Sequence, residues 1–173
     1  MDELSLYRDC AEKSPAKARP HNNFGAILLR RGRLPEAIDE FQAALRIKPD
    51  YADAHYNIGS ALVKQGNLTE GIDHFSETLD LQPGNVKVLN NMAATLVLLE
   101  RYPEAIENFK KALKINPADP DLHRNLAIAM KKQGDLEGAR QHFSRALEIN
   151  PVNESARRNL VEIESLIQET GGN

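Results

Sequence analysis

The chain has 173 residues, of which 41% are hydrophobic and 27% charged, and its formal net charge is −3 with neutral histidines. These values are ordinary for a globular chain, and length alone predicts one domain. The small negative charge predicts no nucleic-acid partner. No apolar run approaches the roughly 18 to 20 residues of a bilayer span, so we expect no membrane insertion by this segment. The single Cys10 excludes an internal disulfide.

The N-terminal segment 2–13 predicts one helix. Tyr7, Cys10 and Pro15 stand at positions that recur in the second helix of later repeats, so residues 1–17 are interpreted as a partial repeat without its first helix. We therefore expect the chain to be part of a longer protein. The opening "MDELSLYRDC" carries acidic residues and no apolar core, so it is not a signal peptide. The localisation is unknown from sequence, and cytoplasmic by default.

A period of 34 residues organises the rest of the chain. It is marked by five prolines, Pro15, Pro49, Pro83, Pro117 and Pro151. Eight residues before each proline stands an aromatic ring: Tyr7, Phe41, Phe75, Phe109 and Phe143. A fixed period of this length indicates a repeat architecture. The predicted repeats are 18–51, 52–85, 86–119 and 120–153, followed by a capping helix and tail over 154–173.

Each repeat is predicted to contain two helices, at about 18–31 and 35–47 in the first repeat. Gly32 ends the first helix, because glycine readily adopts the left-handed conformation at a helix C-terminus. Pro35 lies in the first turn of the second helix, where a missing N–H costs little. Pro49 ends it, because proline disfavours helix in the preceding residue.

Four residues before the phenylalanine of each repeat stands a small residue: Ala37, Gly71, Ala105 or Ala139. These small residues, the rings, the prolines, and the pairs "FG", "IG", "MA" and "LA" in the first helices resemble the tetratricopeptide repeat. The resemblance implies an all-α fold, a right-handed α-solenoid superhelix of helix-turn-helix repeats, with a concave groove lined by the first helices. This sequence departs from the family pattern at Gly71, at Thr78, and at Glu100, where a glycine is usual.

Asparagine holds the sixth place of every repeat, and this column consists of Asn23, Asn57, Asn91, Asn125 and Asn159. Asparagine inside a helix costs several tenths of a kcal/mol against alanine. Its amide has two donors and an acceptor, so a column of amides can hold the main chain of an extended peptide. The column resembles the asparagine ladder in the repeat domain of O-linked N-acetylglucosamine transferase. The alternative is architectural: the amides bond the neighbouring helix and set the twist. Both interpretations remain open.

Other predicted groove residues flank this column. They are Asn22, Tyr56, Asn90, Arg124 and Arg158 at the fifth place, Lys87 at the second and Lys131 at the twelfth. The basic residues of the C-terminal half favour a ligand with an acidic end there. A groove of about 40 Å matches about 12 residues of extended peptide. No repeat combines a basic fifth place with asparagine at the ninth, so the family's clamp for chaperone tails is not predicted.

The sequence predicts no enzyme, no cofactor and no metal site. It contains no P-loop, nucleophile elbow, H-E-x-x-H motif or Cys/His cluster. His21, His55 and His123 share one phase, but successive repeats separate them by about 10 Å or more, too far for ligands of one ion. We expect these histidines to occupy the place of the family's tryptophan.

Three hypotheses follow. The first is a non-catalytic scaffold that binds a protein or peptide segment in the groove. The second rests on residues 2–25, which resemble the junction between the membrane part and the repeat tail of glycosyltransferase-like membrane proteins; the chain would then present acceptor proteins outside the cytoplasm. The third is self-association as a homo-oligomer, because the half-repeat should leave apolar residues uncovered: Leu4, Leu6, Tyr7 or Cys10.

Overall fold

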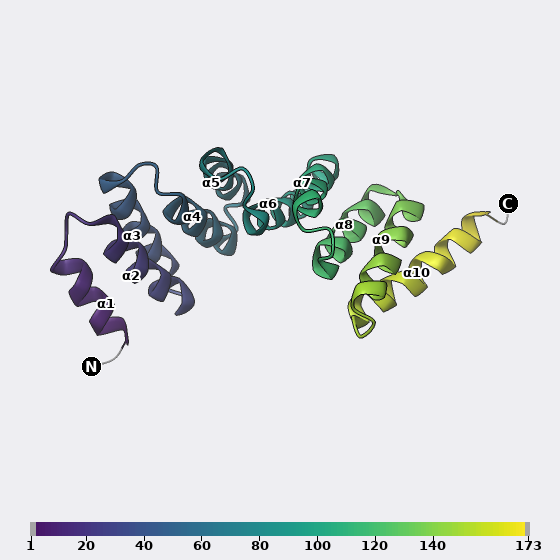
Figure 1. Cartoon of the computed structure of the whole chain (residues 1–173), viewed down its shortest axis with the longest axis horizontal. Helices are drawn as coiled ribbons and strands as arrows, with labels where there is room; N and C mark the ends of the chain where they lie inside the picture. Colours follow the sequence, from purple (N-terminus) through teal and green to yellow (C-terminus); the bar gives the residue numbers. More distant parts are fainter. Residues whose placement is uncertain (1–2, 172–173) are drawn as a thin grey trace. The chain divides into compact units, whose positions relative to one another are not determined.

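The computed structural model describes residues 3–171, which form ten α-helices and no strand (Figure 1). The expected all-α fold is therefore confirmed. The chain divides into two compact units, Met1–Pro83 and Gly84–Asn173, where length alone had predicted one domain. Each unit is described by itself below. Among the helices of residues 3–171, none has both the length and the apolar character of a membrane span.

The first unit contains a single helix followed by two helix pairs. The helices are α1 (Glu3–Glu12), α2 (Ala18–Arg30), α3 (Leu34–Ile47), α4 (Ala52–Gln65) and α5 (Leu68–Leu81). Each helix packs against the next, and the first helices of the two pairs, α2 and α4, also touch each other. The bounds of α2 and α3 agree with the predicted helices of the first repeat to within one residue.

The second unit contains two helix pairs followed by a longer single helix. The helices are α6 (Val86–Leu98), α7 (Tyr102–Ile115), α8 (Pro120–Gln133), α9 (Leu136–Ile149) and α10 (Glu154–Gly171). Consecutive helices pack together, and α6 touches α8. In both units, therefore, first helices adjoin first helices, which is the arrangement that gives a repeat protein a continuous face.

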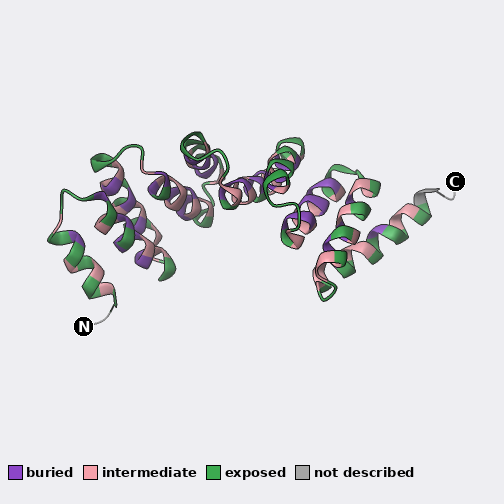
Figure 2. Cartoon of the chain, in the orientation of Figure 1, coloured by how far each residue is buried: buried purple, intermediate pink, exposed green. Residues whose placement is uncertain are grey.

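The predicted aromatic ring of each repeat forms its core. Phe41, Phe75, Phe109 and Phe143 are at most 1% exposed, and buried residues line the inner sides of the helices (Figure 2). The second residue of the pairs "FG" and "IG", Gly25 or Gly59, packs against this ring. A Cβ atom on Gly59 would lie 2.8 Å from Cδ1 of Phe75. In the first unit this place therefore requires glycine, whereas in the second unit Ala93 and Ala127 hold it with their Cβ atoms fully buried.

The turns inside the pairs use left-handed backbone. Gly66 and Gly134 end α4 and α8 with φ of 90° and 93°, and Gly32 has φ of 75°. Glu100 takes the corresponding place after α6 with φ of 59°, the one positive φ of a non-glycine residue in the described chain. A side chain in this conformation is strained, because its Cβ approaches the following carbonyl oxygen.

Candidate functional site

In the first unit, the asparagine column is joined to the preceding repeat. Nδ2 of Asn57 on α4 donates a hydrogen bond of 3.0 Å to Oδ1 of Asn22 on α2. Asn22 is 7% exposed, whereas Asn57 is half-buried and Asn23, the sixth-place residue of α2, is exposed. The sixth place of one repeat therefore bonds the fifth place of the repeat before it.

The same bond recurs in the second unit. Nδ2 of Asn125 on α8 donates to Oδ1 of Asn90 on α6, again at 3.0 Å. Asn90 in turn points its own Nδ2 toward Oδ1 of Asn91, at 3.5 Å. These bonds agree with the architectural interpretation of the column. They use one of the two N–H donors of each sixth-place amide, so they do not exclude a ligand on the half-exposed Asn57 or Asn125.

Two of the predicted basic groove residues of the C-terminal half, Arg124 and Lys131, have acidic neighbours. Arg124 contacts Oδ1 of Asp121 at 2.6 Å and donates to Oδ1 of Asn125 at 3.1 Å. Lys131 on α8 lies 2.6 Å from Oε2 of Glu162 on α10, and its ammonium also donates to Asn159 at 3.4 Å. The attraction of an acidic ligand end to this part of the groove stays a prediction.

The outer residues of this set remain accessible. Arg158 on α10 and Lys87 on α6 are exposed, and Tyr56 on α4 is half-buried. Asn159 directs its Nδ2 to the carbonyl oxygen of Ser155, one turn earlier in its own helix, at 2.8 Å. In the capping helix, the sixth-place amide therefore bonds its own backbone.

Histidine pairs are the feature that the sequence analysis missed. Nδ1 of His55 lies 3.2 Å from Nδ1 of His74, and Nδ1 of His123 lies 2.9 Å from Nδ1 of His142. Each pair joins the two helices of one repeat. Burial, and then the partner histidine, lowers the pKa of His74 and that of His142. In the first repeat, His21 instead contacts Oε2 of Glu40 at 2.7 Å.

The signal for these pairs was present in the sequence. His55 and His74 are 19 residues apart, as are His123 and His142, and His21 and Glu40. This 19-residue spacing joins the first helix of a repeat to its second helix, and it would have predicted the pairs.

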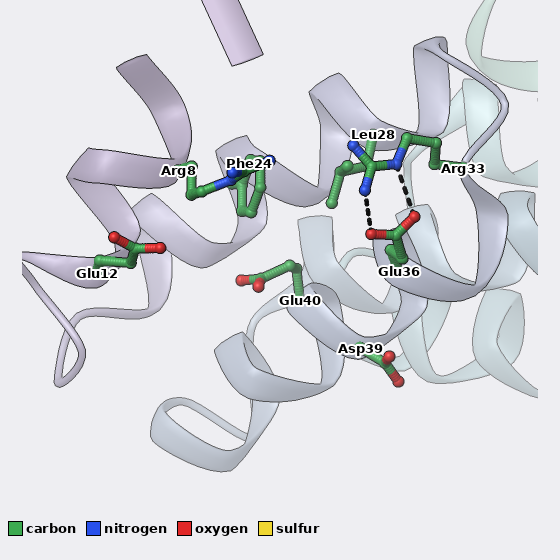
Figure 3. A pocket seen from close by; sticks show the side chains of 8 residues that line it. All are labelled: Arg8, Glu12, Phe24, Leu28, Arg33, Glu36, Asp39 and Glu40. Carbon is green, nitrogen blue, oxygen red and sulfur yellow. Dashed lines mark hydrogen bonds and ion pairs between the residues drawn. The ribbon is translucent and has the colours of Figure 1, made fainter. Parts of the chain in front are cut away.

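A charged pocket of about 300 Å³ lies between α1, α2 and α3 of the first unit (Figure 3). Phe24 and Leu28 of α2 line it with apolar surface. The polar residues around it are Arg8, Glu12, Arg33, Glu36, Asp39 and Glu40. Arg33 forms a two-pronged ion pair with Glu36, and Glu40 contacts His21. The pocket lies outside the predicted groove residues.

Family models of the tetratricopeptide repeat match the chain. One matches residues 25–66 and 95–134, a second matches 52–85 and a third 120–151. Together these matches cover residues 25–85 and 95–151. No curated protein sequence matches the chain.

Several solved structures share the fold. YrrB, described as a TPR protein with an unusual peptide-binding site, is similar with a TM-score of 0.83 and 22% identity, over 95% of this chain and 85% of YrrB. MamA is similar with a TM-score of 0.78 and 19% identity, over 86% of this chain and 81% of MamA. MamA from Desulfovibrio magneticus RS-1, from residue 41 to its end, is similar with a TM-score of 0.74 and 20% identity, over 88% of this chain and 96% of that MamA chain.

Proposed function

The chain belongs to the tetratricopeptide repeat family, and we propose that it is a non-catalytic scaffold that binds an extended segment of another protein. Within each unit, the ligand lies along the first helices, against the sixth-place asparagines. The observation that carries this proposal is the position of Asn57 and Asn125. Both are half-buried beside a neighbouring first helix, and both are fixed in orientation by a bond to a fifth-place amide.

A fixed amide suits the recognition of a peptide main chain. Holding the side chain in one orientation before binding reduces the entropy lost when a ligand arrives. The second N–H of Asn57 and its carbonyl oxygen can meet a backbone C=O and N–H of the ligand. Such contacts recognise the main chain of the ligand and depend little on its side chains. YrrB, similar over most of this chain, is described as having a peptide-binding site, which supports a groove of this kind here.

The experiment separates ligand binding from architecture. Wild-type chain selects binders from a library of random linear peptides, and the affinity of a selected peptide is then measured by fluorescence polarisation. Replacing Asn57, Asn91 and Asn125 by alanine should lower affinity by at least tenfold, which is about 1.4 kcal/mol. The control is Asn108→Ala, which removes an asparagine from the second helix α7, outside the predicted groove residues.

Two outcomes decide the matter. Loss of binding in the triple variant with retention in Asn108→Ala supports amide recognition of the ligand. Equal affinity in wild type and triple variant rejects it and leaves the column with its structural bonds alone. Circular dichroism of each variant verifies that the helices persist.

Self-association is a second proposal, because the first unit exposes apolar surface near its N-terminal helix. Leu6 is 50% exposed and Cys10 is exposed, whereas Leu4 and Tyr7 pack partly against the core. Exposed apolar surface favours association between copies. Light scattering over a range of concentrations tests this: a mass that rises with concentration and falls in Leu6→Ser supports it, and a constant monomer mass rejects it. The glycosyltransferase-like context of residues 2–25 stays a prediction.

A further inference from the structure

The two Nδ1 atoms of the His55–His74 pair are separated by the distance expected of two ligands of one metal ion. His55 lies on α4 and His74 on α5, and their Nδ1 atoms are 3.2 Å apart. Two imidazole nitrogens bound to one tetrahedral zinc ion, at about 2.0–2.1 Å each, are about 3.3 Å from one another. The two rings are therefore already at the required separation, and the proton that they share is the group that an ion would replace.

The outer contact of His55 fixes which nitrogen is available. Nε2 of His55 lies 2.9 Å from the carbonyl oxygen of Pro49. A carbonyl oxygen only accepts, so Nε2 must carry the hydrogen, and Nδ1 of the neutral ring presents its lone pair toward His74. Histidine ligands of metals commonly donate their other N–H to a backbone carbonyl, which orients the ring and raises its basicity. His55 already has this contact.

The charges around the pair favour a cation. The carboxylates of Glu70, Asp73 and Glu77 act on His74 against the lowering of its pKa by burial. Glu70 precedes His74 by four residues and Glu77 follows it by three, so both lie on the same side of α5. Within residues 3–171, no group of three such side chains is already close enough to hold a metal. The remaining positions would therefore be filled by water, or by a carboxylate that turns inward.

We propose that His55 and His74 bind a divalent transition-metal ion of the class that prefers imidazole ligands, joining the two helices of the second repeat. The ion takes Nδ1 of both rings, and water or a carboxylate of α5 completes its coordination. Imidazole suits Zn²⁺, Cu²⁺ and Ni²⁺, whereas Mg²⁺ and Ca²⁺ prefer oxygen ligands. Both rings tip slightly out of their present line, so that their lone pairs converge on the ion.

The second pair provides a matched comparison inside the same chain. His123 and His142 have Nδ1 atoms 2.9 Å apart, and Nε2 of His123 lies 3.1 Å from the carbonyl oxygen of Pro117. Their surroundings differ. Gly138 and Arg145 stand where the second repeat has Glu70 and Glu77.

The charges near this second pair oppose an ion. Lys110 on α7 lowers the pKa of His142. Asp135 acts in the opposite direction, but its carboxylate caps α9 by accepting from the Gly138 N–H at 2.9 Å. This pair therefore keeps its shared proton and binds an ion more weakly.

The test is isothermal titration of ZnCl₂ into protein freed of any affinity tag, at about pH 7.5 so that free histidine is neutral. The wild type should bind one Zn²⁺ ion with clearly higher affinity than any further Zn²⁺ ion. His74→Gln should weaken this first binding by at least tenfold, and His142→Gln should leave it within about twofold. MgCl₂ should give no comparable binding.

A second variant guards against a folding defect in His74→Gln. Replacing the exposed Glu70 and Glu77 together by glutamine should weaken Zn²⁺ binding several-fold without a change in helicity. The proposal is overturned if wild type binds Zn²⁺ no more tightly than His74→Gln, or if His142→Gln loses as much. Because the pair lies outside the sixth-place asparagines, peptide affinity in the same variants shows whether the groove survives independently.

Discussion

The Asn57 side chain donates to Asn22 across two neighbouring repeats, at 3.0 Å, and Asn22 is 7% exposed. Because Asn22 is buried, removal of the Asn57 donor leaves Oδ1 of Asn22 without this hydrogen bond in a place that water reaches poorly. We expect Asn57→Ala to lower the free energy of unfolding by about 1–2 kcal/mol, and Asn22→Ala by about 1 kcal/mol, since the half-exposed Asn57 can turn to solvent. Urea unfolding followed by circular dichroism measures both.

The double variant identifies the bond itself. If the two amides are coupled, Asn22→Ala together with Asn57→Ala should cost about 0.5–1 kcal/mol less than the sum of the single changes. Asn23→Ala is the control, because Asn23 is exposed and its loss should change stability by less than about 0.5 kcal/mol. Strict additivity would contradict the bond.

Much of the fold was predictable because helix periodicity and turn residues act locally. The 34-residue period located the repeats, and Gly32 and Pro35 located the turn between the helices of the first. The site was less predictable, because its bonds join helices. Asn57 meets Asn22 only after α4 packs on α2, and His55 meets His74 only after α4 packs on α5. Sequence spacing gives each residue's phase on its own helix, but not its partner.

Gly59 should resist substitution. A Cβ atom there would lie 2.8 Å from the Phe75 ring and 2.9 Å from the carbonyl oxygen of Gly71. Because Phe75 is fully buried and the carbonyl belongs to the backbone, neither can move without repacking. We expect Gly59→Ala to destabilise the chain by about 1–3 kcal/mol, the usual cost of overpacking. Thermal unfolding provides the measurement. Gly84→Ala, which meets nothing within 4 Å, should be nearly neutral, and an equally neutral Gly59→Ala would contradict the packing argument.

Replacement of Glu100 by glycine should increase the stability of the chain. Its φ of 59° is a left-handed conformation that costs a residue with a Cβ about 1–2 kcal/mol. Glycine removes this strain but gains freedom in the unfolded chain, worth roughly 0.5–1 kcal/mol. Glu100→Gly should therefore stabilise the chain by about 0.5–1 kcal/mol in urea unfolding. The reverse exchange, Gly134→Ala at φ of 93°, should destabilise it. A loss of stability in Glu100→Gly would show that the carboxylate compensates for the strain.

Stability should fall in mild acid through the His123–His142 pair. Burial, then His123 on α8 and Lys110 on α7, lowers the pKa of His142, and only Asp135 opposes them. The unfolded chain, with a histidine pKa of about 6.5, therefore binds the proton more readily than the folded chain. The contribution of this group is complete above pH 6.5 or so and is lost as the pH falls from there toward the lowered pKa of the folded state.

The measurement is the melting temperature at several pH values between about 7.5 and 5, a range that brackets the ordinary histidine pKa. His142→Gln removes the titrating ring, so its curve should be flatter than that of the wild type in this window. His21, His55 and His74 remain in both proteins and cancel in the difference, whereas His123 loses its partner in the variant. Parallel curves would mean that His142 takes up its proton equally in the folded and unfolded chains, contrary to its buried contact with His123 at 2.9 Å.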